Sequence, residues 1–221
     1  APPVAAFSVL TTAEADAVKD NPAVYAVEQN QALQATVITY DGASTFADVN
    51  ADIDDTDAVQ PEVAAHFVVD GYPDDGMPTN ATLRLRGAST RLAEQKSYRV
   101  KLSGAAAAWR GEKTLQFNKH PYDLTRLRNK LAMDLFRDIP HVPSLRTQFV
   151  RISIENRTAG GVTYAASADY GLFTHVEKMG EEYLAARGLP TDGNIYKAED
   201  FPFRPGPRLA LDGTGKRVNK S

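Results

Sequence analysis

The sequence predicts an α+β fold, in which one long helix packs on a face of an antiparallel β-sheet. Two observations lead to this class. Several short segments alternate apolar and polar residues, which is the period of a strand with one buried face. The longer segment 123–137 instead repeats leucine at helical spacing, and strands grouped around one helix are typical of α+β proteins.

The N-terminal part of the chain is predicted to supply a short helix and the first strands. Thr11 to Glu14 have capping-box spacing, which predicts a helix that continues to Val18. Residues 34–40 form a β-rich run that ends at a turn signal, and residues 62–69 alternate in the pattern of a strand. Residues 1–79 are therefore expected to be an acidic, β-rich N-terminal extension.

Residues 82–86 and 97–102 are predicted to pair as a β-hairpin. The small residues between them, from Gly87 to Thr90, read as a turn. Because strand residues alternate between faces, leucines on one face leave basic residues on the other. The predicted basic face consists of Arg84, Arg86, Arg99 and Lys101.

The long helix is predicted to begin at Asp123, to carry a leucine stripe at helical spacing, and to end before Pro140. Strands at 149–154 and 170–176 and a short helix at 181–187 follow. Asp134 of the long helix is a candidate acidic partner for Lys101, although a surface carboxylate is the simpler reading. Residues 201–221 are rich in proline and glycine and read as a loose tail.

Composition excludes several classes of protein. The 221 residues contain no cysteine, which excludes a disulfide framework, a zinc-thiolate site and a thiol nucleophile. No apolar run approaches the roughly 20 residues of a membrane span, so no membrane span is expected. The chain begins with Ala1 rather than methionine, which indicates a removed signal peptide or a cut chain.

The charge of the chain is strongly divided. Residues 1–83 contain one basic and fourteen acidic residues, whereas residues 84–221 contain twenty-four basic and fourteen acidic ones. Either the two parts attract each other and pack, or the basic part binds an anion.

The turn at Gly87 is a candidate phosphate site. Like charges on one face of a hairpin destabilise it unless they are solvated, paired or built around an anion. Backbone N–H groups beside a glycine and two hydroxyls at Ser89 and Thr90 suit a phosphate, as do the flanking Arg86, Arg91 and Lys96. A solvated basic hairpin is the alternative.

Five short blocks of the sequence stand in a specific order. The first is Leu85-Arg86-Gly87-Ala88-Ser89-Thr90-Arg91, and Lys96-Ser97-Tyr98-Arg99-Val100-Lys101-Leu102 follows it. The others lie at 127–132, at 171–177 and at Gly193-Asn194-Ile195-Tyr196-Lys197. Together they span about residues 80–200, and ordered blocks are more specific than any one motif. In this order the blocks resemble motifs of the spore-coat protein H (CotH) kinase family.

The resemblance implies an atypical protein kinase, of which residues 80–200 form the N-terminal lobe. It implies ATP with magnesium as the cofactor and transfer of the γ-phosphate to Ser or Thr of a partner protein. Val176 and Glu177 would form the hinge beside adenine, and Lys197 is expected to reach the site. The residues implied to lie at the phosphates are Arg86, Gly87, Ser89, Thr90, Arg91 and Lys101.

Two departures from the family pattern favour a different reading. Position 88 is alanine where the family usually has asparagine, and the sequence ends before the family's catalytic aspartates and Trp-Asp-Leu-Asp block. We therefore expect this chain alone to be inactive, with the magnesium ligands in a missing C-terminal part of the same protein. The alternative is a non-catalytic coat or surface module for adhesion or assembly. Both readings predict a secreted or cell-envelope protein with no nucleic acid partner.

An acidic segment near residue 50 resembles a calcium loop. Ile53 stands where an EF-hand needs glycine, and Val59 where it needs glutamate, so a solvated acidic loop is the favoured reading. The four candidate calcium ligands are Asp48, Asn50, Asp52 and Asp54.

Overall fold

A computed structural model describes residues 32–54, 59–72, 76–105, 107–139, 144–157, 163–192, 195–198 and 215–217. The helix expected at 11–18 and most of the tail at 201–221 lie outside these ranges. Within the described ranges, no helix combines the length and the apolar character that crossing a membrane requires.

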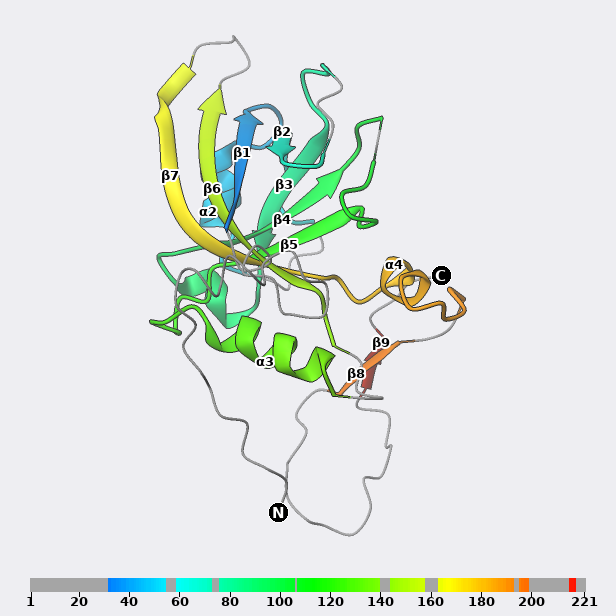
Figure 1. Cartoon of the computed structure of the whole chain (residues 1–221). Helices are drawn as coiled ribbons and strands as arrows, with labels where there is room; N and C mark the ends of the chain where they lie inside the picture. Colours follow the sequence, from blue (N-terminus) through cyan, green and yellow to red (C-terminus); the bar gives the residue numbers. More distant parts are fainter. Residues whose placement is uncertain are drawn as a thin grey trace, which may run out of the picture.

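Seven strands close into a barrel with the neighbour order β1-β2-β3-β4-β5-β7-β6 (Figure 1). Strands β1 and β6 pair in parallel, and all other neighbours are antiparallel. The strands are β1 (Leu33–Tyr40), β2 (Val63–Val69), β3 (Ala81–Arg86), β4 (Ser97–Leu102), β5 (Thr114–Asn118), β6 (Thr147–Arg157) and β7 (Thr163–Val176). The predicted α+β class is confirmed. The sheet, however, is mixed and closed rather than purely antiparallel, because alternation identifies a strand's buried face but not its partner.

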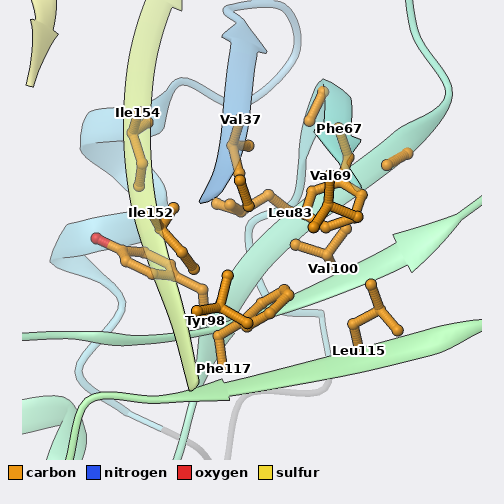
Figure 2. Close-up of a cluster of buried hydrophobic side chains, with 14 of the residues drawn as sticks. Val37, Phe67, Val69, Leu83, Tyr98, Val100, Leu115, Phe117, Ile152 and Ile154 are labelled. Carbon is orange, nitrogen blue, oxygen red and sulfur yellow. The ribbon is translucent and has the colours of Figure 1, made fainter. Parts of the chain in front are cut away.

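The core fills the inside of the barrel. Figure 2 shows apolar side chains from neighbouring strands pointing toward one another, among them Val37, Phe67, Leu83, Phe117 and Ile152. Each of these five side chains is at most 1% exposed. Burying a side chain of this size contributes about 1.5–3 kcal/mol, so the inward residues decide which face of every strand turns outward.

Short elements surround the barrel. Helix α2 (Phe46–Ala51) begins with a capping box between Thr45 and Asp48 and buries Phe46 against the core. The other elements are the 3-10 helix η2 (Ser89–Leu92), helices α3 (Arg128–Arg137) and α4 (Glu181–Ala185), and a hairpin of β8 (Tyr196–Ala198) and β9 (Gly215–Arg217).

Helix α3 lies beyond one end of the barrel and begins five residues later than predicted (Figure 1). The expectation that its leucine stripe packs on the sheet is wrong, since Leu127, Leu131 and Leu135 are 50–59% exposed. The one buried residue of α3 is Lys130, whose ammonium lies over the ring of Phe149 in β6. Helical spacing identified an amphipathic helix, but not which face contacts the barrel.

Asp134 is not the partner of Lys101. Its carboxylate lies 2.8 Å from Lys130 Nζ, one helical turn away. The hydroxyl of Thr147, at the start of β6, also donates to it at 3.3 Å. Asp134 therefore ties α3 to the barrel.

Candidate functional site

The predicted hairpin of β3 and β4 is confirmed, with the turn at Gly87. Leu83 pairs with Val100 and Leu85 with Tyr98, and all four side chains are buried inside the barrel. The residues between them face outward, as the alternation predicts. On this outer face Arg84 lies directly opposite Arg99.

The register extends this pair into a row across four strands. Arg99 of β4 lies opposite Gln116 of β5, and Gln116 lies opposite Val176 at the end of β7. Barrel closure therefore brings the basic hairpin and the segment compared with a kinase hinge onto one surface. Because β7 follows β5 by more than 40 residues, local patterning gives no sign of this neighbourhood.

A pocket of about 300 Å³ opens on this surface. It combines the basic row with the glycine turn and with the residues that follow β7. Its lining residues are Gln60, Arg84, Leu85, Arg86, Gly87, Arg91, Arg99, Gln116 and Lys178. No acidic residue is among these described lining residues, so the pocket attracts negative charge.

Burial and mutual repulsion disfavour the charged form of the arginines in the pocket. Burial, and then the neighbouring charge of Arg99, lower the pKa of Arg86 to about 10. Burial, and then Arg84, also lower the pKa of Arg99, while Glu62 opposes the shift. In the part of the chain that the structure describes, none of these three arginines has an ion-pair partner. A bound anion would offset this repulsion.

The turn itself requires glycine. Gly87 has a φ of +112°, and a Cβ at this position would lie 2.0 Å from Oγ1 of Thr90. The predicted phosphate residues Arg86 and Gly87 line the pocket, whereas Ser89 and Thr90 lie in η2 and do not.

Arg91 lines the pocket but uses its guanidinium within the protein. It is 3% exposed, and its Nη1 lies 2.6 Å from Oδ2 of Asp52. Its Nε donates to the carbonyl of Gly87 at 2.7 Å. Arg91 thus fixes the glycine turn to the C-terminal end of α2, and these donors do not point to a ligand.

The same contacts correct the reading of residues 48–54 as an acidic loop. Asp48 caps α2 through Thr45, and Asn50 accepts a hydrogen bond from the hydroxyl of Tyr98 at 2.7 Å. Asp52 is buried against Arg91. The described residues contain no group of three or more His, Asp or Glu side chains that could hold a metal. Spacing alone suggested alternating ligands, but a helix turns these side chains apart.

The two lysines predicted for the site are not among the described lining residues. Lys101 is on the same outer face as Arg99, but it is exposed and is not among the lining residues. Lys197 lies in β8, and its side chain is outside the described part of the structure. Arg84 and Arg99 follow from the strand alternation, whereas Gln60, Gln116 and Lys178 lie near them through the pairings of β2 with β3, β4 with β5 and β5 with β7.

Glu177 lies beside the pocket, with its side chain turned inward. It is 1% exposed, and its carboxylate lies 2.7 Å from Arg146 Nη2 and 2.8 Å from Arg187 Nη2. Burial acts to raise its pKa, but hydrogen bonds from Arg187 and Arg146 hold the pKa below its usual range. This clamp fixes the chain where it passes from Val176 to Lys178.

Two sequence comparisons show which known proteins this chain is similar to. Residues 83–217 match the family model described as CotH kinase protein. A relative from Bacillus subtilis (strain 168), inner spore coat protein H, is 26% identical over 152 residues. The aligned region covers 64% of this chain and 38% of the relative, so this chain spans well under half of the relative's length.

Proposed function

Because this chain belongs to the CotH kinase protein family, we propose that it is the ATP-binding portion of a CotH-like protein kinase. In this proposal the pocket beside Gly87 binds the phosphates of the nucleotide. The observation that carries it is the outward row in which Arg84 and Arg99 stand side by side, with no ion pair to a carboxylate among the described residues. Paired arginines suit phosphate because each guanidinium can donate two parallel hydrogen bonds.

The row also suggests how a nucleotide would lie. The phosphates would lie against Arg84, Arg86 and Arg99, near the backbone of Gly87, where a side chain would crowd the turn. The base would lie toward Val176 and Lys178, at the other end of the row. Ser89, Thr90 and Lys101 would border the phosphates from the turn and the strand, and Glu177 would hold the base-side segment in place.

The pocket suits the phosphates but not the magnesium ion that the family implies. Mg²⁺ prefers carboxylate and other oxygen ligands, and the described lining has no carboxylate. We therefore derive no catalytic step through the metal. In the whole protein, the γ-phosphate would pass to a Ser or Thr hydroxyl of a protein partner. The residues described here bind and orient the nucleotide. The relative's name supports a spore coat or cell-envelope location.

A second candidate function is a non-catalytic module for coat assembly. The observation that favours it is the exposed apolar surface of α3, where Leu131, Leu135 and Phe136 are 45–59% exposed. Ala88 in the turn, where the family usually has asparagine, points the same way.

A series of adenine nucleotides distinguishes the two. Binding of ATP, ADP, AMP and adenosine would be measured by titration calorimetry at fixed ionic strength. The kinase proposal predicts that affinity rises with the number of phosphates and falls as salt is added. Absence of ATP binding by the folded chain would favour the assembly module.

A further inference from the structure

Glu112 has a buried carboxylate that lies outside the pocket and contacts a segment at its edge. Glu112 lies in the tight turn between β4 and β5, where it exchanges two backbone hydrogen bonds with Trp109, of 2.9 and 3.0 Å. Gly111 has a φ of +81°, which a turn this tight favours. The Glu112 side chain is directed inward and is 3% exposed.

The carboxylate of Glu112 joins three separate segments. Its Oε2 accepts a hydrogen bond of 3.2 Å from the backbone N–H of Lys178, a pocket-lining residue. Its Oε1 lies 3.6 Å from Nη2 of Arg146, just before β6, and its Oε2 lies 3.6 Å from Nε2 of His175 in β7. Of these contacts, the one to Lys178 leads directly to the pocket.

Stability alone does not account for a carboxylate here. Burial, the largest effect, raises the pKa of Glu112 to about 7, so the charged form is costly at this position. His175 offers little compensation, because burial, and then Arg110 and Arg146, lower its pKa to about 3 and leave it neutral. Buried charges of this kind usually cost more than well-packed apolar side chains.

The segment on which Glu112 acts is held firmly just before Lys178. The backbone N–H of Glu177 donates to the carbonyl of Arg146 at 2.9 Å, and its carboxylate is clamped by Arg146 and Arg187. After Lys178, the chain reaches α4 through Gly180. The bond from Glu112 is therefore what fixes the peptide plane of Lys178 between the clamp and the helix.

We propose that Glu112 is a positioning residue that fixes the backbone of Lys178 and thereby the edge of the basic pocket. The proposal rests on the proposed function, in that the pocket's ligand is taken to be a phosphate group. It assigns Glu112 no contact with that ligand. To position Lys178, the side chain at residue 112 must be long enough for an accepting oxygen to reach the Lys178 amide. Its negative charge is not needed, because a negative charge beside a basic pocket opposes anion binding.

Two single substitutions separate reach from charge. Glu112→Asp keeps the charge but shortens the side chain by one methylene, so its oxygen no longer reaches the amide of Lys178. Glu112→Gln keeps the reach and an accepting oxygen but removes the charge. Asp138→Asn, at an exposed position after α3, controls for the loss of one negative charge.

Two readouts would be taken on the full chain: hydrogen exchange of the Lys178 amide by NMR, and affinity for inorganic pyrophosphate by titration calorimetry. We expect Glu112→Asp to accelerate the exchange about tenfold and to weaken pyrophosphate binding about fivefold, as for the loss of one hydrogen bond. Glu112→Gln should stay within about twofold of the wild type in exchange, and should bind pyrophosphate at least as tightly.

The outcomes distinguish this proposal from the proposed function. Wild-type exchange and affinity in Glu112→Asp would overturn it, as would faster exchange with unchanged affinity. A loss in Glu112→Gln with none in Glu112→Asp would show that charge, and not position, is what matters, and would also overturn it. If the wild type binds no pyrophosphate, the proposed function fails, while exchange at Lys178 still decides whether Glu112 fixes that backbone.

Discussion

Arg84 and Arg99 lie directly opposite each other on the outer face of β3 and β4. Directly opposed like charges destabilise a strand pair, and in the described part of the chain no carboxylate pairs with either guanidinium. The pocket therefore has two linked properties: it weakens the free protein slightly, and it favours an anion that neutralises both side chains.

Removing one member of the pair should stabilise the free protein. Arg99→Gln relieves the repulsion from Arg84, and we expect a gain of about 0.5 kcal/mol in the free energy of unfolding. Urea unfolding at low ionic strength measures it. Arg128→Gln is the matched control, since its side chain is 78% exposed and lies on α3. A clear loss of stability in Arg99→Gln would show that Arg99 is a structural partner.

Anions should stabilise the wild type through the same residues. A ligand that binds only the folded state at 100 times its Kd adds about 2.7 kcal/mol to stability. We therefore expect pyrophosphate to raise the Tm of the wild type and to raise that of Arg84→Gln much less. Thermal melts at constant ionic strength measure this. An equal rise in both proteins would place the anion elsewhere.

Glu112 should make the stability of the protein fall as the pH rises. Its pKa is about 7 in the folded state against an ordinary value of 4.5, so the folded state holds the proton more tightly. The raised pKa of Glu112 therefore contributes to the free energy of unfolding. This contribution is present in full below pH 4.5 and is lost as the pH rises through 7, which lowers the free energy of unfolding by up to about 3 kcal/mol. Glutamine does not titrate, so the Tm of Glu112→Gln should gain on the wild type from pH 5 to pH 8. A difference in Tm that does not change with pH would contradict this shift.

The contact between Arg91 and Asp52 should be essential for folding. Both side chains are at most 4% exposed, and removing one partner of a buried pair typically costs about 3–5 kcal/mol. We expect Asp52→Ala to lose stability in that range in urea unfolding. Asp138→Ala breaks an exposed pair with Arg137 and should cost less than about 1 kcal/mol. Similar losses in both variants would argue against the buried pair.

Gly87 should be the least replaceable residue of the turn. Gly87→Ala meets Oγ1 of Thr90 at 2.0 Å and adopts a left-handed φ, which together should cost more than about 1 kcal/mol. Thr90→Ala in the same chain removes the clash and should restore part of the loss. Gly42→Ala, where a Cβ meets nothing within 4 Å, is the control for thermal melts. Equal stability of Gly87→Ala and Gly42→Ala would contradict the turn geometry.

The sequence predicts the part of the site that depends on local alternation. The β3–β4 hairpin and the outward direction of Arg84 and Arg99 follow from the leucines that alternate with them. Gln116 could not be placed because it lies in β5, a strand that the alternation did not predict. Lys178 could not be placed because it follows β7, which pairs with β5 from a distant part of the chain. Local patterning also fails for the packing of α3. The leucine spacing indicates a helix, but the side chain that contacts the barrel is Lys130 and not a leucine.

We propose that the outer face of β3 and β4 binds the phosphates of ATP. Titration calorimetry of ATP with the wild type, Arg99→Gln, Lys101→Ala and Arg128→Gln tests it most directly. We expect at least a tenfold rise in Kd for Arg99→Gln, as for a lost charge-assisted contact of about 1.5–3 kcal/mol. We expect a smaller change for Lys101→Ala, which lies outside the described lining, and none for Arg128→Gln. An unchanged Kd for Arg99→Gln, with ATP still bound, would contradict the claim.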